Sequence, residues 1–158
     1  MMLVATYVAP SAIEGVGIFA AEPISAGALI WRLEPGLDRL IGRAELGGLC
    51  GVFRDFVHRY SYPYPHDPER LIVELDNGRF MNHSDAPNTV FSDPDAGFTL
   101  RDISRGEELT CNYAEFDPGF EILPGRRFTT VAAAALAPAA GSQTVPVRDA
   151  GGAAGSNP

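Results

Sequence analysis

The feature that most constrains the fold of this chain is a polar stretch that closely follows an apolar run. Residues 71–75 read Leu-Ile-Val-Glu-Leu, which is typical of a strand. Shortly after it, Asn82, His83 and Ser84 are consecutive polar side chains with both hydrogen-bond donors and acceptors. If they face inward they need partners, because an unpaired buried polar group costs about 1–3 kcal/mol. The alternative is a turn in which they bond to their own backbone, since Asn, Ser, Asp and Pro are common turn residues.

The length of the chain, 158 residues with a hydrophobic fraction of 46%, allows one domain and little more. The sequence has no run of 18 apolar residues and no basic segment ahead of an apolar N-terminal stretch, so neither a membrane span nor a signal peptide is expected. Cys50 and Cys111 cannot form a disulfide framework. We expect both to be small buried residues in a cytoplasmic protein.

The formal net charge of −8 belongs to residues 1–130, because Arg148 and Asp149 cancel in the remainder. An acidic domain favours basic partners and disfavours direct binding to nucleic acid. All 12 basic residues are arginine, so the chain has no lysine side chain of its own. The three histidines are scattered without ligand spacing, so no metal site is expected.

Short apolar runs separated by glycine and proline indicate a mostly β fold. The expected strands are residues 3–8, 18–21, 29–33, 71–75, 89–91, 98–100 and 108–112. The first two are expected to form a hairpin around Gly15 and Gly17. Residues 76–78, Asp-Asn-Gly, predict a second hairpin turn.

One main helix is predicted over residues 43–60. Its apolar side chains recur at helical spacing: Leu46, Leu49, Phe53, Phe56, Val57 and Tyr60. The glycines within it each cost up to about 1 kcal/mol relative to alanine, so packing of this face must offset them. Residues 61–70 contain Pro63, Pro65 and Pro68, which predict an irregular loop that lines a binding surface or serves as a rigid connector.

The last part of the chain has a different composition. From residue 131 onward Ala, Gly and Pro dominate and no aromatic residue occurs. Such a segment cannot bury enough apolar area to fix its backbone. We therefore predict a folded domain over residues 1–130 and a disordered tail over residues 131–158.

Two motifs accompany the polar stretch. Residues 14–20 read Glu-Gly-Val-Gly-Ile-Phe-Ala, and residues 102–113 read Asp-Ile-Ser-Arg-Gly-Glu-Glu-Leu-Thr-Cys-Asn-Tyr. Each alone occurs in ordinary turns. In this order, Gly-x-Gly, Arg-Phe-x-Asn-His-Ser and Gly-Glu-Glu-Leu-Thr-x-x-Tyr resemble the SET-domain protein lysine methyltransferases, and the compact chain resembles small stand-alone bacterial forms. The resemblance covers residues 3–117.

The resemblance implies several small sheets, with the Asn-His-Ser segment passing through a C-terminal loop as a pseudoknot. Local sequence patterns alone would not suggest a pseudoknot, because threaded chains are rare. The implied cofactor is S-adenosylmethionine. The implied cofactor-binding residues are Gly15, Val16, Gly17, Arg79, Asn82, His83 and Phe116. Glu108 is expected to be structural and to bond backbone amides.

Methyl transfer from a sulfonium to an amine depends mainly on orientation. Deprotonating a lysine with a pKa near 10.4 at pH 7 costs about 4.6 kcal/mol, and burial in an apolar channel offsets part of that cost. Aromatic walls suit both the sulfonium and the amine. The resemblance makes Tyr113 the catalytic residue and Tyr62, Tyr64 and Tyr113 the substrate channel.

We therefore expect a methyltransferase that uses S-adenosylmethionine and acts on lysine in a protein, with a basic protein favoured by the acidic charge. The alternative is a catalytically weak or inactive SET-like binding module. It is favoured by the segment after Tyr113, where only Phe116 and Phe120 could close over the cofactor. A third interpretation is a structural β-domain whose motifs are turns. The sequence does not specify the target or the oligomeric state.

Overall fold

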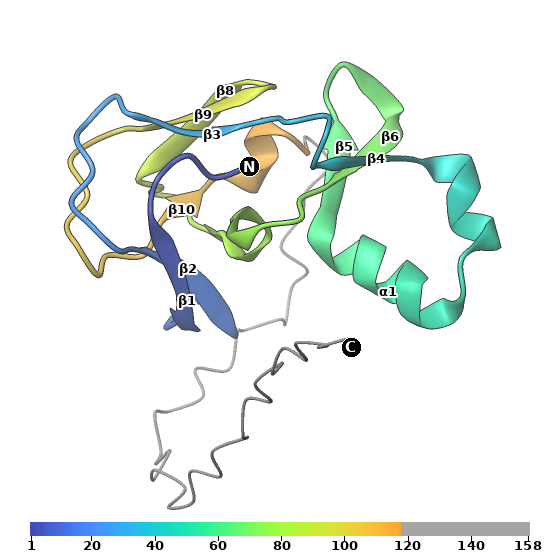
Figure 1. The fold of residues 1–158 in the computed structure, drawn as a ribbon, viewed down its shortest axis with the longest axis horizontal. Helices are drawn as coiled ribbons and strands as arrows, with labels where there is room; N and C mark the ends of the chain where they lie inside the picture. Colours follow the sequence, from blue (N-terminus) through green and yellow to red (C-terminus); the bar gives the residue numbers. More distant parts are fainter. Residues whose placement is uncertain (118–158) are drawn as a thin grey trace, which may run out of the picture.

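The computed structural model describes residues 1–117, which form four small sheets rather than one continuous sheet (Figure 1). The strands are β1 (Thr6–Pro10), β2 (Val16–Ala20), β3 (Leu29–Arg32), β4 (Arg39–Gly42), β5 (Ser61–Tyr64), β6 (Asp67–Val73), β7 (Asn82–His83), β8 (Thr89–Asp93), β9 (Ala96–Thr99) and β10 (Thr110–Cys111). The helices are α1 (Gly51–Tyr60) and the 3-10 helices η1 (Arg43–Gly48), η2 (Asn77–Phe80) and η3 (Tyr113–Glu115). This mostly β architecture confirms the predicted fold class. The predicted tail lies outside the described residues.

The hairpin of β1 and β2 is confirmed, with Tyr7 paired to Phe19 and their rings stacked at 5.7 Å between centroids. A three-stranded sheet in the order β3-β9-β8 contains the predicted pair of strands near residues 89–100. The parallel pair β7-β10 places Asn82 beside Thr110 and His83 beside Cys111. This pairing brings the Asn-His-Ser segment against the C-terminal strand, which is the close approach that a pseudoknot requires.

The prediction of an irregular loop over residues 61–70 is wrong, because β5 and β6 form a hairpin there. The prolines are tolerated for a positional reason. β5 is the edge strand of the sheet β4-β6-β5, so Pro63 can lack a ladder donor. Pro68 lies at the start of β6, ahead of the residues that pair with β4, Arg70 to Val73.

The single predicted helix is also corrected. It is divided into η1 and α1, with Leu49 and Cys50 in extended conformations between them. Of its predicted apolar face, Val57 is buried, whereas Phe53 is 63% exposed. Cys50 is exposed, contrary to expectation, and Cys111 is buried. The glycines in η1 and at its boundary with α1 weaken helix propensity where packing does not compensate.

The predicted hairpin turn at residues 76–78 is a 3-10 turn instead. The Asp76 carboxylate accepts a hydrogen bond from the Gly78 amide at 2.9 Å and so caps η2. Side-chain capping of this kind directs the chain from β6 into the polar stretch. No helix within residues 1–117 is long and apolar enough to cross a membrane.

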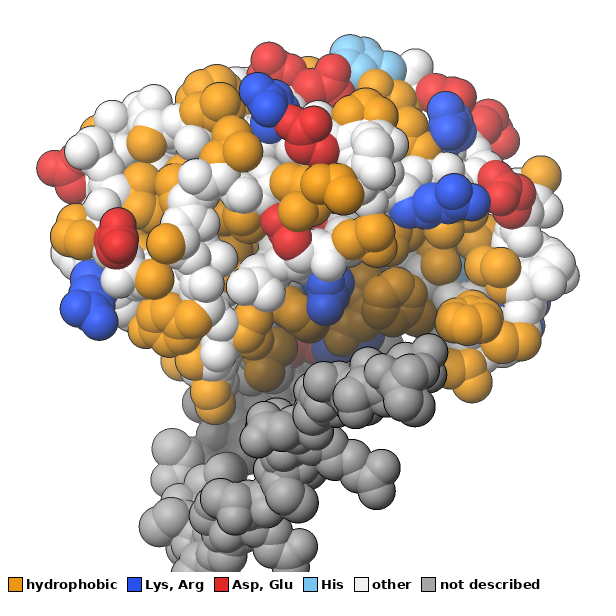
Figure 2. All heavy atoms as spheres, in the orientation of Figure 1, with side chains coloured by type: hydrophobic (Ala, Val, Ile, Leu, Met, Phe, Trp, Pro, Cys, Tyr) orange, Lys and Arg blue, Asp and Glu red, His pale blue; other side chains and the backbone are white. Residues whose placement is uncertain are grey.

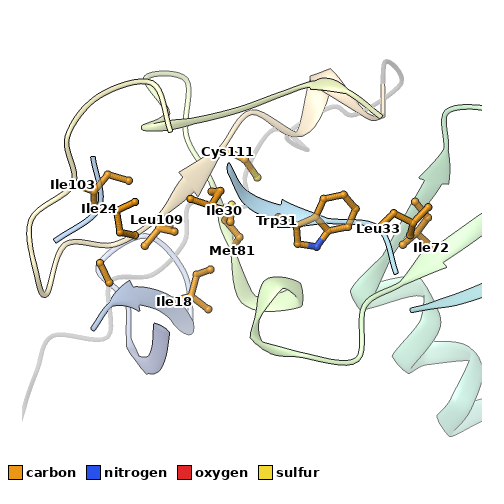
Figure 3. Close-up of a cluster of buried hydrophobic side chains, with 11 residues drawn as sticks. Ile18, Ile24, Ile30, Trp31, Leu33, Ile72, Met81, Ile103, Leu109 and Cys111 are labelled. Carbon is orange, nitrogen blue, oxygen red and sulfur yellow. The ribbon is translucent and has the colours of Figure 1, made fainter. Parts of the chain in front are cut away.

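The main core joins these small sheets (Figure 3). Figure 3 shows one continuous row of side chains, from Ile24 and Ile103 at one end through Trp31 to Leu33 and Ile72 at the other. Ile24 and Ile103 also exchange backbone hydrogen bonds of 2.9 and 2.8 Å. A smaller cluster of Val57, Leu71 and Val73 anchors α1 to β6. Figure 2 shows hydrophobic side chains gathered over α1, at the lower right of that face.

We expect replacement of Ile30 by alanine to lower the free energy of unfolding by about 2–5 kcal/mol, because Ile30 is fully buried and the substitution leaves a cavity. Urea denaturation measures this change. The control is Leu29→Ala on the same strand, where the side chain is 37% exposed and a loss below about 1 kcal/mol is expected. Equal losses at both positions would contradict the burial pattern.

Candidate functional site

Asn82 faces inward and links its own motif directly to the other two sequence motifs. Its side chain is buried, and its amide nitrogen donates to the Val16 carbonyl at 3.1 Å, to the Glu14 carbonyl at 3.3 Å and to the Glu108 carboxylate at 2.8 Å. The inward-facing interpretation is therefore confirmed for Asn82. The turn interpretation holds for Ser84, whose hydroxyl accepts from the Ala86 amide at 3.1 Å.

Glu108 joins the third motif to the same network. Its carboxylate accepts hydrogen bonds from the Ser11 hydroxyl at 2.8 and 2.9 Å as well as from Asn82. The expectation that Glu108 bonds backbone amides is corrected, since these partners are side chains. Charge-assisted hydrogen bonds of this type are about twice as strong as neutral ones. They hold the β1-β2 hairpin against the polar stretch.

The glycines of the hairpin serve this packing. A side chain on Gly17 would overlap the Glu108 carboxylate and would lie 3.1 Å from the Asn82 amide. Gly15 has a φ of +49°, in the left-handed region that favours glycine. The structure thus gives Gly15 a conformational role and Gly17 a role in the close approach of the motifs.

A second buried amide fixes the third motif. Asn88 accepts from the Thr110 amide and donates to the Glu108 carbonyl, both at 2.8 Å. The Thr89 hydroxyl donates to the Thr110 carbonyl at 2.8 Å. These contacts hold β10 in place, and the residues that follow it include Tyr113.

Tyr113 adjoins both the polar network and a cavity. Its amide donates to His83 Nδ1 at 3.2 Å, and His83 Nε2 lies 3.2 Å from the Asp85 carboxylate. The Tyr113 hydroxyl donates to the Met81 carbonyl at 2.7 Å. Burial raises the pKa of Tyr113 well above its ordinary value. The hydroxyl therefore stays protonated at neutral pH, as a fixed donor rather than a base.

Beside Tyr113 lies a cavity of about 250 Å³. Its aromatic lining residues are Trp31, Tyr60, Tyr62, Phe91, Tyr113 and Phe116. The Phe116 ring lies 4.6 Å from that of Tyr62, 5.7 Å from that of Tyr113 and 5.9 Å from that of Phe91, measured between centroids. A cavity with this lining suits a flat or cationic group.

Of the site residues predicted from the sequence, Arg79, Tyr62, Tyr113 and Phe116 line this cavity. Arg79 lies over the Phe80 ring at 4.4 Å and donates to the Asp76 carbonyl at 2.7 Å. The predicted residues outside the lining are Gly15, Val16, Gly17, Tyr64, Asn82 and His83. Among these, Tyr64 packs against His66, with ring centroids 5.2 Å apart.

Sequence reasoning missed Trp31, Phe91 and Glu74 as lining residues. Glu74 had a signal in the sequence, because it interrupts the apolar run of residues 71–75 with a charge. In the structure it is 6% exposed. The Tyr62 hydroxyl donates to one of its carboxyl oxygens at 2.9 Å, and the other oxygen has no hydrogen-bond partner in the described part of the chain.

The environment of Glu74 raises its pKa from 4.5 to about 7. Burial is the largest cause, and the neighbouring carboxylates of Asp76 and Asp38 add to it. The hydrogen bond from Tyr62 and the charge of the Met1 amino group act in the opposite direction. Glu74 therefore exchanges its proton near neutral pH, unlike an exposed glutamate.

A family model described as SET domain matches residues 15–114. Among curated protein sequences, none matches this chain. A solved structure of the Chaetomium thermophilum Polycomb Repressive Complex 2, a humanized mutant bound to the inhibitor GSK126, is 25% identical with a TM-score of 0.54. The match covers 73% of this chain and 15% of that one.

Two further structures have the same fold. One is a Polycomb complex from the same organism bound to S-adenosylmethionine, 23% identical with a TM-score of 0.55, and the match covers 73% of this chain and 16% of that one. The other is an active Polycomb repressive complex 2 in the basal state, 26% identical with a TM-score of 0.52, covering 70% and 15%. This chain thus corresponds to a small part of much longer proteins.

We expect Gly17→Ala to destabilise the protein by about 1–3 kcal/mol, because the new methyl group must displace the Glu108 carboxylate from Ser11 and Asn82. Urea denaturation gives the free energy of unfolding. Gly36→Ala is the matched control, since a side chain there would meet no atom within 4 Å. A loss no larger than in the control would show that the hairpin can move away without cost.

We expect Glu74→Gln to remove a pH dependence of stability between about pH 4.5 and pH 7. The folded pKa is raised, so the folded state binds the proton more tightly, and stability falls as the pH rises through this window. The difference corresponds to up to about 3 kcal/mol. Chemical denaturation of both proteins at pH 5 and pH 7.5 measures it. Parallel pH profiles for parent and variant would contradict the burial of this charge.

Proposed function

The chain belongs to the SET-domain family, and on that premise we propose that it is a methyltransferase that uses S-adenosylmethionine to methylate lysine side chains of a protein substrate. Members of this family are typically protein lysine methyltransferases. The proposal rests on the observation that the three motifs contact one another. Asn82 and Glu108 bind the glycine hairpin, and Tyr113 lies between this network and an aromatic cavity.

The residues present fit the cofactor. Aromatic faces attract a sulfonium cation, and Tyr113 and Phe116 provide such faces. We assign the cofactor contacts to the backbone of Gly15, Val16 and Gly17 and to Asn82, His83, Arg79 and Phe116. When bound, S-adenosylmethionine supplies an electrophilic methyl group. A Chaetomium thermophilum complex with a similar fold was solved bound to S-adenosylmethionine, which supports the choice of cofactor.

Tyr113 orients the substrate in this proposal. Its hydroxyl is protonated and held by the Met81 carbonyl at 2.7 Å, so it cannot remove a proton from the amine. Its oxygen retains a lone pair that can accept a hydrogen bond from the amine. The surrounding rings exclude water and favour the neutral amine, which offsets part of the roughly 4.6 kcal/mol needed to deprotonate lysine at pH 7.

The charge of the chain supports a basic protein as the substrate, since the formal net charge is −8. We also place the protein in the cytoplasm, on the strength of two free cysteines within the described residues. Equal methylation of acidic and basic proteins would contradict the first of these assignments.

Calorimetric titration with S-adenosylmethionine tests the cofactor assignment. We expect binding by the parent and loss of binding in Asn82→Ala, because the variant releases the hairpin carbonyls and Glu108. Ser92→Ala, an exposed residue on β8, is the control and should bind like the parent. Denaturation curves establish that each variant is folded at the titration temperature. Absence of binding by the parent would contradict the proposal.

Labelled methyl transfer to a cell lysate tests the reaction itself, without background from the lysine-free chain. Tyr113→Phe keeps the ring contacts and removes the hydroxyl. We expect its cofactor affinity to stay within about twofold and its methyl transfer to fall by at least about tenfold, equivalent to 1.4 kcal/mol of transition-state stabilisation. Cofactor binding without transfer by the parent would indicate the binding module instead.

A further inference from the structure

We propose that Glu74 recognises the substrate amine in the cavity, accepting hydrogen bonds from a primary ammonium group through its carboxylate. This inference rests on the proposed function for the identity of the substrate. It adds a specificity-determining residue that lies outside the three motifs.

The first argument is the incomplete hydrogen bonding of Glu74. A carboxylate has about four acceptor positions, and within the described residues only the Tyr62 hydroxyl donates to this one, at 2.9 Å. The side chain is 6% exposed, so bulk water does not replace the missing partners. A buried acceptor without a partner is costly, and a ligand that supplies N–H donors removes that cost.

The second argument is position. Glu74 lines the same cavity as Tyr62, Tyr113 and Phe116. Gly78 keeps room for it, because a side chain there would overlap the Glu74 carboxyl group. The cavity therefore presents a buried acid among aromatic faces. That combination suits binding of the protonated lysine side chain, whose ammonium group donates three hydrogen bonds and is attracted by the rings. Glu74 thus acts on the binding of the substrate, whereas the apolar surroundings act on its later deprotonation.

The third argument is charge. The nearest charged groups that act on Glu74 are the carboxylates of Asp38 and Asp76 and the Met1 amino group. The Met1 amino group is already bound to Asp38, at 3.0 Å. The other charged or titratable groups around the cavity are His58, Arg59, Tyr60, Tyr62, Arg79, Cys111, Tyr113 and Asp117.

The two arginines of the cavity have partners of their own. Arg59 pairs with Glu14 at 3.4 Å, and Arg79 lies over the Phe80 ring and donates to the Asp76 carbonyl. Among residues 1–117, neither arginine forms a hydrogen bond or an ion pair with Glu74. Glu74 therefore remains available to a cation supplied by the substrate.

Trp31 provides a direct readout, because it is the only tryptophan of the chain and lines the cavity. The probe is n-butylammonium, which has the length and charge of a lysine side chain, and its binding is followed by Trp31 fluorescence. Tetramethylammonium is the comparison cation, since it can contact the rings but has no N–H donor. Neutral 1-butanol measures apolar binding alone.

We expect the parent to bind n-butylammonium at least about tenfold more tightly than 1-butanol and more tightly at pH 8 than at pH 6, as the carboxylate forms. Glu74→Gln should lose the preference for n-butylammonium over tetramethylammonium while it keeps the hydrogen bond from Tyr62. It should fold, because it removes a buried charge. Glu69→Gln, an exposed glutamate on β6, should behave like the parent.

Equal binding of n-butylammonium by the parent and Glu74→Gln would overturn the inference, whatever the result with S-adenosylmethionine. Binding that depends on Glu74 without any cofactor binding would sustain the amine site and refute the proposed methyl transfer. The two proposals can therefore fail separately.

Discussion

The hydrogen bond from the Asn82 amide to the Glu108 carboxylate is the contact on which the arrangement of the site depends. Two of the four sheets, β1-β2 and β7-β10, have only two strands, and an isolated pair of strands is marginally stable in water. Asn82 satisfies carbonyl groups of the β1-β2 hairpin, and Glu108 reaches back to Ser11 on the far side of that hairpin. Loss of Asn82 would leave the Glu108 carboxylate with the Ser11 hydroxyl alone, and loss of Glu108 would remove the charged acceptor of the buried Asn82 amide.

The same contact explains why the site is built from segments far apart in the sequence. The backbone pairs β7 with β10 over only two residues each, which is too little to fix their position. Asn88 and Thr89 add hydrogen bonds to the Thr110 backbone and lock that pair. Tyr113 follows directly, with its amide on His83. Tyr113 is thus held in place relative to the glycine hairpin by side-chain hydrogen bonds rather than by a continuous sheet.

Local sequence patterns predicted some of the local elements and missed others, such as the β5-β6 hairpin. The β1-β2 hairpin and the pair β8-β9 are set by turn residues and alternation, and both were predicted. β4 was missed, because it is an isolated apolar pair whose strand state depends on β6. The helix over residues 43–60 was predicted as one element, yet it divides near Leu49, where long-range packing is too weak to offset the glycines. The close approach of β7 and β10 was predicted from the family resemblance alone, because pairing between distant segments leaves no periodic pattern in the sequence.

Glu74 shows the limit of motif-based analysis at the site itself. The motifs located Asn82 and Tyr113, but the aromatic cavity beside Tyr113 also contains an acid that belongs to no motif. A glutamate that only supports the fold should have its acceptors filled, since natural proteins leave few buried polar atoms unsatisfied. Within residues 1–117, one carboxyl oxygen of Glu74 accepts from Tyr62 and the other has no hydrogen-bond partner. This missing partner and the raised pKa of Glu74 both reduce stability at neutral pH. Uncompensated costs of this kind concentrate where a protein binds something, which is the reason to assign this carboxylate to a ligand rather than to the core.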